Sequence, residues 1–295
     1  MARKPERSVI LTAAVTGNIH TLEMCPHLPA GVKGISDAAV AAHKAGASIV
    51  HIHARDEDGT PTSNLEIFGG ILSRIREKAP DAIISITTGG TAGPEERQKV
   101  IPLFRPEMAS FNSGSMNFSM AGNPATYQTI FSNSIQNMID CIKLMNESDT
   151  QPEFEIFDFG MLSNVAFLKK QGLLIREPYF QFVPGPLGAV AASEENLLHF
   201  VRQLRHLFGE DARFSMVGPG RRAFRFETMC ALLGGNVRVG MEDSLYIDAR
   251  GTITTGNDQQ VLKMRRILED LDFTVATPVQ AREILHLKGA NKVNF

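Results

Sequence analysis

The feature that most constrains the fold is a regular alternation of short apolar runs with longer amphipathic stretches. Such runs, rich in β-branched residues, are typical of buried parallel strands, and the stretches between them are typical of crossover helices. Eight runs occur, at 9–16, 48–55, 82–88, 108–112, 153–159, 179–183, 213–217 and 236–242. Eight strands in a chain of 295 residues favour a closed (β/α)8 TIM barrel over an open sheet.

Helix boundaries are signalled between these runs. The sequence predicts a helix over 36–45, with Ser36 as N-cap and Gly46 just past its end, and another over 64–79 that stops at Pro80.

The segment after the eighth run, 258–286, predicts the eighth helix plus an extra C-terminal helix over 278–287, with Pro278 at its first position. We expect this extra helix to cover a barrel face or to meet another subunit. Since no linker, repeat or composition shift divides the chain, residues 1–295 are expected to form a single TIM-barrel domain.

Composition narrows the class of protein. The 30 Lys and Arg residues nearly balance the 32 Asp and Glu residues and are scattered, so a nucleic-acid partner is not expected. The cysteines Cys25, Cys141 and Cys230 are few and widely spaced, which favours neither disulfides nor a thiolate metal site. Without a recognisable signal segment or membrane span, we expect a cytoplasmic location and no membrane partner.

Alternation along the strands predicts a polar barrel interior. His51 and His53 share one face of their strand, and Arg238 and Glu242 share one face of theirs. The same parity directs further polar residues inward: Thr12, Thr16, Ser85, Thr87, Ser110, Asn112, Glu155, Gln181, Ser215 and Asn236. A barrel interior is normally filled with branched apolar residues, so this polar set predicts a site.

A metal site follows from the same geometry. His51 and His53 lie at the C-terminal end of a predicted strand, and barrel closure brings Glu242 from the last strand to the same mouth. An isolated His-x-His pair is also compatible with hydrogen-bonded interior histidines. Two histidines and a carboxylate, however, are a catalytic ligand set that leaves coordination positions open. Zinc is predicted over iron or manganese.

Several segments resemble the β-keto acid cleavage enzyme family, typified by 3-keto-5-aminohexanoate cleavage enzyme, in the same order along the chain. They are ILTAAVTGN at 10–18, AGASIVHIHARDEDGTPT at 45–62, ISITTGG at 84–90, PEMASFNSGSMNF at 106–118, PEFEIFDFG at 152–160 and GGNVRVGMED at 234–243. The resemblance implies a homo-oligomer, expected to be a tetramer, that uses one Zn²⁺ per subunit. It also implies condensation of a β-keto acid with an acyl-CoA, usually acetyl-CoA, giving acetoacetate and a new acyl-CoA.

The resemblance also implies roles for individual residues. It places the zinc ligands at His51, His53 and Glu242, a catalytic pair at Arg238 and Asp243, and substrate contacts at Thr87, Ser110 and Glu155. In this chemistry Asp243 would be the base that forms the enolate, oriented by Arg238.

The catalytic pair requires an irregular strand end. On a regular strand Arg238 would lie about 13 Å below Glu242, and Asp243 would point to the opposite face. We therefore expect the strand to end or bend near Gly240. Otherwise Arg238 simply neutralises Glu155 or Glu242 inside the barrel.

Two glycine-containing turns are candidate anion sites. Residues 87–96, TTGGTAGPEE, follow the third strand, and Gly89 and Gly90 could bring backbone N–H groups to the substrate. Residues 217–222, VGPGRR, follow the seventh strand, where Arg221 and Arg222 could meet the CoA phosphates. A plain strand-to-helix turn and a solvated helix start are the respective alternatives.

One departure from the family bears on the substrate. Lysine-fermentation members carry an acidic residue where Ile19 stands, so an amino-bearing substrate loses its partner. We predict a β-keto acid with a neutral or anionic tail, with Asn18 and His20 nearby as candidate contacts.

Three other functions remain open. A metallohydrolase would need His-x-His on the first strand and further histidines at later strand ends, whereas His199, His206 and His286 fall in helical stretches. A class II metal-dependent aldolase or lyase is chemically closer and would release an aldehyde without CoA. A non-enzymatic metal-binding barrel is disfavoured by the polar interior.

Overall fold

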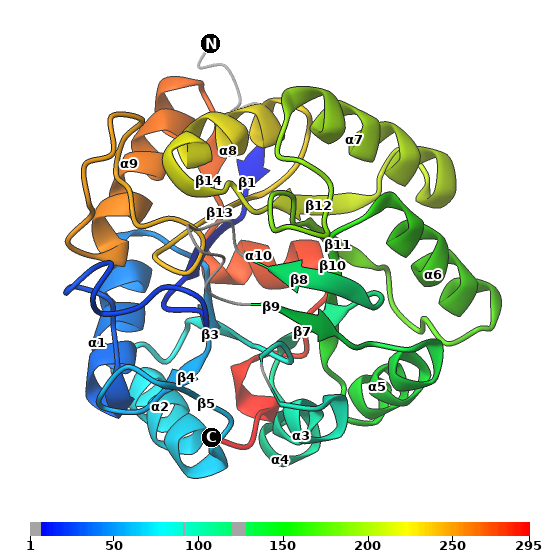
Figure 1. Ribbon diagram of the computed structural model, residues 1–295, viewed down its shortest axis with the longest axis horizontal. Coiled ribbons are helices and arrows are strands. Elements are labelled where there is room, and N and C mark those ends of the chain that lie inside the picture. The colour runs from blue at the N-terminus through cyan, green and yellow to red at the C-terminus, as the bar shows by residue number, and fades with distance from the viewer. Residues whose placement is uncertain (1–6, 91, 120–127) are drawn as a thin grey trace.

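The computed structural model describes residues 7–90, 92–119 and 128–295. Thr91 of the glycine-rich turn lies outside these ranges. Within them the predicted barrel is confirmed: one parallel sheet of eight strands, in the order β12-β11-β10-β7-β6-β3-β2-β13, is ringed by helices (Figure 1). Its strands are β2 (Leu11–Ala14), β3 (Ile49–Ile52), β6 (Ile83–Ile86), β7 (Met108–Asn112), β10 (Gln151–Ile156), β11 (Tyr179–Phe182), β12 (Arg213–Met216) and β13 (Val237–Val239).

The sheet closes where β13 meets β12. The backbone N–H of Asn236 donates to the carbonyl of Phe214 at 2.7 Å, and Val217 and Arg238 form a parallel bridge. Closure brings the last strand beside the first, so residues from β3 and from the end of β13 share one mouth.

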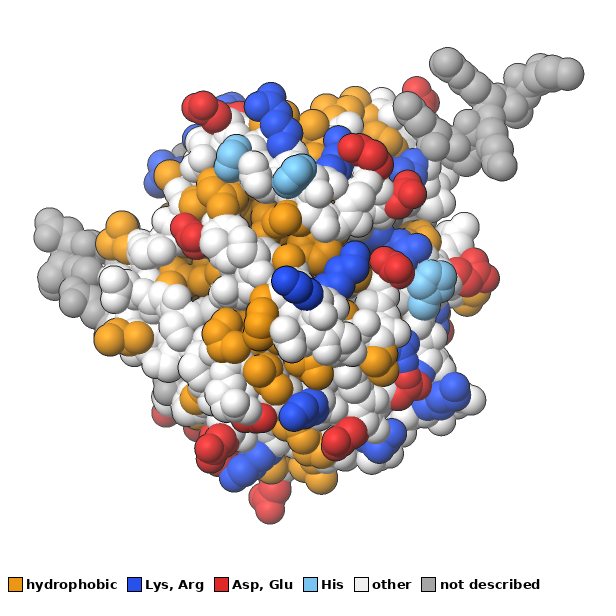
Figure 2. Space-filling view, turned by 90° about the vertical axis from the view of Figure 1, so that its right-hand side faces the viewer, with side chains coloured by type: hydrophobic (Ala, Val, Ile, Leu, Met, Phe, Trp, Pro, Cys, Tyr) orange, Lys and Arg blue, Asp and Glu red, His pale blue; other side chains and the backbone are white. Residues whose placement is uncertain are grey.

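The helices follow the strands in the expected alternation. They are α1 (Gly31–Ala45), α2 (Leu65–Lys78), α3 (Pro94–Gln98), α4 (Val100–Phe104), α5 (Ile135–Glu147), α6 (Phe159–Lys170), α7 (Glu194–Phe208), α8 (Ala223–Leu232), α9 (Asn257–Asp270) and α10 (Pro278–Leu285), with 3₁₀ turns η1 (Gly220–Arg222) and η2 (Ala290–Lys292). Acidic and basic side chains are interspersed on the outer face seen in Figure 2. No helix in the described ranges is long and apolar enough to span a membrane.

Several predicted boundaries need correction. Ser36 is not an N-cap: α1 already begins at Gly31, and the Ser36 hydroxyl donates to the Lys33 carbonyl within the helix. The predicted strand 153–159 is shifted, because β10 runs over Gln151–Ile156 and Asp158 caps α6 by accepting from the Gly160 N–H. Gly46 and Pro278, in contrast, stand at the predicted helix ends.

An apolar floor seals the bottom of the barrel. The lowest inward side chains form a buried cluster with α10, whose members are Ile10, Ile49, Ile83, Met108, Tyr179, Ala276, Ala281 and Leu285. The extra C-terminal helix therefore covers a barrel face, as predicted. Arg282 of α10 fixes it by donating to both oxygens of Glu107, which is buried just before β7, at 2.7 and 2.8 Å.

Short strand pairs lie outside the eight-stranded barrel sheet. β1 (Ser8–Val9) pairs with β14 (Thr274–Val275), and β4 (Ala54–Arg55) pairs with β5 (Pro61–Thr62). The antiparallel pair β8 (Met116–Ser119) and β9 (Gln128–Phe131) was not predicted, and it matters for the site because its aromatic side chains line the mouth.

Candidate active site

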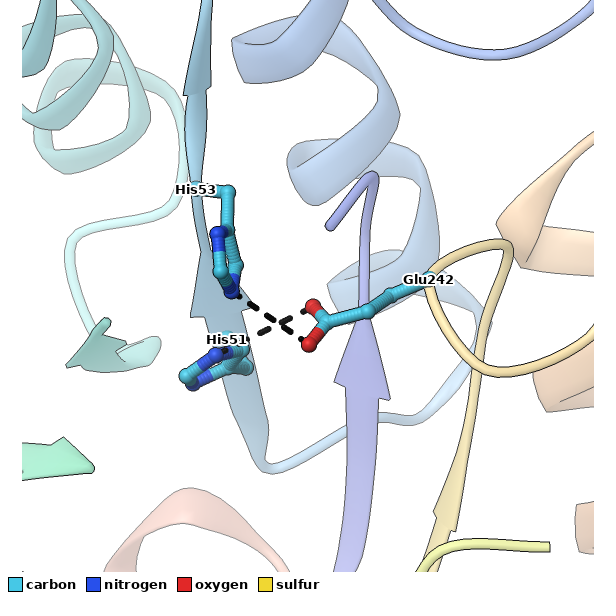
Figure 3. Close-up of side chains that lie close together, drawn as sticks. All are labelled: His51, His53 and Glu242. Atoms are coloured by element: carbon cyan, nitrogen blue, oxygen red, sulfur yellow. Dashed lines mark ion pairs between the residues drawn. The ribbon is translucent and has the colours of Figure 1, made fainter. Parts of the chain in front are cut away.

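His51, His53 and Glu242 converge at the barrel mouth (Figure 3). Their candidate ligand atoms all lie within 4.8 Å of one another. Nε2 of His51 is 3.8 Å from Glu242 Oε2, and Nε2 of His53 is 3.3 Å from Glu242 Oε1. The predicted convergence of the three side chains is thus confirmed.

Unpartnered polar atoms mark this cluster. His51 Nε2 and Glu242 Oε2 are buried without a hydrogen-bond partner among the described residues, although such groups are normally paired. Nδ1 of His51 lies 3.3 Å from the Ser85 hydroxyl, which orients the ring so that Nε2 faces Glu242. Burial lowers the pKa of His51 to about 3, which keeps its imidazole in the neutral, metal-binding form. The donor set therefore fits a divalent cation.

Gly240 supplies the irregular strand end that the sequence required. β13 stops at Val239, and Gly240 adopts a φ of +148° and starts a turn in which its carbonyl accepts from the N–H groups of Asp243 and Ser244. A Cβ at this position would lie 2.0 Å from the carbonyl oxygen of Ala14, so only glycine fits. The turn carries Glu242 and Asp243 back toward the barrel axis.

Arg238 forms hydrogen bonds to both Glu242 and Asp243. Its Nε and Nη2 donate to the two carboxylate oxygens of Asp243 at 2.8 and 2.9 Å, Nη2 also donates to Glu242 Oε1 at 2.7 Å, and Nη1 donates to Gln181 Oε1 at 2.9 Å. The structure thus brings the predicted Arg238–Asp243 pair together beside the candidate metal ligands. The bidentate geometry is the strong form of such a pair.

The pKa values of Glu242 and Asp243 are shifted in opposite directions. Burial opposes ionisation of Glu242, but the Arg238 guanidinium beside it outweighs burial and holds the pKa of Glu242 well below its usual range. For Asp243 burial dominates, and Arg238 offsets only part of it, so the pKa of Asp243 is raised. One carboxylate is therefore suited to bind a cation and the other to accept a proton.

Two buried acids were missing from the predicted site. Glu153 lies below Glu155 on β10 and accepts from Gln181 Nε2 at 3.0 Å. Burial raises the pKa of Glu153 to about 7 and that of Glu155 to about 8. Glu227 of α8 accepts from the backbone N–H of Arg238 at 2.8 Å, and burial raises its pKa well above the usual range.

A cavity of about 230 Å³ opens above these groups. Its walls include most of the predicted site residues: Asn18, His20, His53, Thr87, Gly89, Gly90, Asn112, Glu155, Gln181, Arg238, Glu242 and Asp243. His20 is held by a hydrogen bond between its Nδ1 and the Met241 carbonyl at 2.8 Å. Gly17 packs directly against the Glu242 side chain at a φ of +60°. A Cβ at this position would be 2.4 Å from Glu242 Cγ, so the close contact requires glycine.

Three predicted contact residues lie away from the cavity lining. The Ser110 hydroxyl is buried and accepts from the Thr88 N–H at 2.9 Å, so it holds the turn after β6. Arg222 pairs with Glu194 and lies over the Phe226 ring, and Arg221 lies 5.1 Å from the centre of the Tyr246 ring. Both arginines stand on η1, at the rim next to Pro219, which lines the cavity.

Comparison with known proteins agrees with this architecture. A TIM barrel with polar groups gathered at the C-terminal mouth of its strands is typical of an enzyme. Residues 8–287 match the family model described as beta-keto acid cleavage enzyme, and the chain belongs to that family.

Curated relatives and solved structures extend the match. The chain is 38% identical to 3,5-dioxohexanoate:acetyl-CoA acetone transferase of Paraburkholderia graminis, with 98% of this chain and 99% of that protein covered. It is 36% identical to 3-keto-5-aminohexanoate cleavage enzyme of Fusobacterium nucleatum, with 95% and 98% covered. The structure of ObcA with oxaloacetate, at 20% identity, superposes with a TM-score of 0.75 over 89% of this chain and 68% of that one, which shows the shared fold.

Proposed function

We propose that this enzyme condenses a β-keto acid with acetyl-CoA and releases acetoacetate and a new acyl-CoA, with a bound zinc ion at His51, His53 and Glu242. The observation that carries the proposal is the convergence of these three side chains beside the Arg238–Asp243 pair in one cavity. The family and the names of the curated relatives, three of which specify acetyl-CoA, support the same reaction.

The charge balance supports a cation at this position. Glu242 and Asp243 share the guanidinium of Arg238, so these two carboxyl groups exceed the positive charge that they face. A divalent ion bound by two neutral imidazoles and one carboxylate would offset this excess of acidic groups. Nitrogen and oxygen donors in such a set suit zinc. A bound zinc ion would polarise the keto and carboxylate oxygens of the acid and so acidify its C2 hydrogen.

The protein side chains would perform the proton transfer and positioning. Asp243 Oδ would accept the C2 proton, since its raised pKa makes it a better base than an ordinary carboxylate. Arg238 would hold Asp243 in place through its two hydrogen bonds. Thr87, Asn18 and the Gly90 N–H would receive the polar end of the acid, because they line the same cavity, and the Gly89 N–H holds Thr87 in place by donating to its hydroxyl at 2.9 Å.

The bond changes balance without a protein nucleophile. C2 of the acid attacks the acetyl thioester carbonyl, and a carbon–carbon bond forms as the CoA thiolate leaves. The thiolate then attacks the original keto carbon, and the C2–C3 bond breaks. The original acyl group is left on CoA, and C2, bearing the acetyl group, leaves as acetoacetate after regaining a proton. Arg221 and Arg222 on η1 are the proposed contacts for the CoA phosphates.

The test is to mix the purified protein with acetyl-CoA and a panel of β-keto acids, and to measure acetoacetate and acyl-CoA with and without a chelator. We expect both products in equal amounts and their loss on metal removal, with recovery on adding Zn²⁺. Release of an aldehyde without CoA would instead identify an aldolase. Full activity after complete metal removal would refute the metal role.

A further inference from the structure

One wall of the cavity is aromatic. Phe118 of β8 and Phe131 of β9 meet Phe157, which follows β10, and all three line the cavity. Their ring centres lie 6.1, 6.4 and 6.2 Å apart in edge-to-face pairs. We call these three residues the aromatic wall.

The aromatic wall is built into the fold. The backbones of Ser119 and Leu187 exchange hydrogen bonds of 3.2 and 2.8 Å, which tie β8 to the loop after β11. Arg97 lies 4.7 Å from the centre of the Phe131 ring and donates to the Thr88 carbonyl at 3.0 Å. Further apolar residues extend the surface: Ile19, Val183, Pro184, Pro186, Val217 and Pro219.

The charged groups that line this cavity are already engaged. Its described lining contains no lysine and one arginine, Arg238, whose donors face Asp243, Glu242 and Gln181. An anionic tail would therefore lose hydration without gaining a free cation. For a cationic tail, Glu155 is the acid in the described lining to which Arg238 donates no hydrogen bond, and burial, which raises its pKa to about 8, favours its uncharged form near neutral pH.

The position of the aromatic wall favours the acid over CoA. Phe118, Phe131 and Phe157 come from the loops that follow β7 and β10, whereas TIM barrels bind phosphate at the loops after their seventh and eighth strands. In this barrel those strands are β12 and β13, and Arg221 and Arg222 stand on the turn after β12. CoA entering over that turn would leave the aromatic wall to the acid.

We infer that the site selects β-keto acids whose tail beyond the keto carbon is uncharged and apolar, with that tail packed against Phe118, Phe131 and Phe157. The inference rests on the proposed function. It narrows the neutral or anionic tail expected from the sequence to an apolar one.

Three acids of matched length test the tail charge: 3-oxohexanoate, 3-oxoadipate and 5-amino-3-oxohexanoate, each with acetyl-CoA. We expect kcat/KM for 3-oxohexanoate to exceed that for either charged acid by about tenfold or more. A higher kcat/KM for a charged acid would overturn the inference and leave the proposed function standing. If no acid is converted, the proposed function fails, and the inference fails with it.

A variant series tests whether the tail of the acid binds against the aromatic wall. In the native enzyme kcat/KM should rise about fourfold from 3-oxopentanoate to 3-oxohexanoate, the value of one buried methylene. Phe118→Ala should bring this ratio close to one, and the ratio does not depend on how much protein is folded. Phe167→Ala, on the outer face of α6, is the matched control and should keep the native ratio. An unchanged ratio in Phe118→Ala with a raised KM for acetyl-CoA would assign the aromatic wall to CoA and overturn the inference.

Discussion

Replacing Arg238 by lysine keeps the positive charge but removes the planar set of donors. Arg238 makes four hydrogen bonds to Asp243, Glu242 and Gln181, and a lysine ammonium in the same space can keep about two of them. Charge-assisted hydrogen bonds contribute about 1.5–3 kcal/mol each, so two lost at the lower value amount to about 3 kcal/mol. If that loss falls on the transition state, kcat drops about 10²-fold.

Arg282→Lys is the matched control. Arg282 also holds a buried carboxylate, Glu107, through two hydrogen bonds, but at the floor of the barrel. We expect both variants to lower the free energy of unfolding by about 1–3 kcal/mol, measured by denaturant titration. Only Arg238→Lys should lower kcat for acyl-CoA formation about 10²-fold. Equal losses of kcat in the two folded variants would refute the argument that Arg238 positions the base.

Three further predictions concern single positions. His53→Ala should abolish the binding of about one Zn²⁺ per chain in metal analysis, whereas His199→Ala on α7 should retain it; retention by both would contradict the ligand assignment. Gly240→Ala places a Cβ 2.0 Å from a β2 carbonyl oxygen and should cost about 3 kcal/mol or more of unfolding free energy, so a change below about 1 kcal/mol would count against the strand-end argument. Ser110→Ala leaves a buried N–H without its acceptor and should cost about 1–3 kcal/mol with less than a tenfold loss of kcat/KM; unchanged stability with a larger rise in KM would instead make Ser110 a substrate contact.

Strand periodicity predicted most of the barrel and the centre of the site. The parity of His51 on β3, of His53 directly after it and of Arg238 on β13 is visible in the sequence, because side chains alternate along a strand. The need for a bend at Gly240 followed from the same rule, since a regular strand cannot direct Arg238 and Asp243 to one point. Strand ends were less predictable because they depend on hydrogen bonds to neighbouring strands.

Other features depend on contacts between distant segments. Glu227 lies on a helix, where an acidic residue normally faces water, and only the packing of α8 against β13 places its carboxylate on the backbone N–H of Arg238. Glu153 did carry a signal, because it lies two residues before Glu155 and shares its face of β10, but only Glu155 was named in the prediction. The β8–β9 pair carried a signal, since Met116 and Phe118 alternate with polar residues as strands do.

The electrostatics of the polar mouth depend on the apolar floor. Electrostatic attraction grows as the local dielectric constant falls, so the hold of Arg238 on Asp243 and Glu242 is strongest where water is excluded. Ile10, Ile49 and the other floor residues, sealed by α10, exclude water from below the site. The same exclusion raises the pKa of Glu153 and Glu155, the carboxyl groups nearest the barrel axis on β10. Helix α10 therefore supports the chemistry of the mouth from the opposite end of the barrel, although it contributes no residue to the cavity lining.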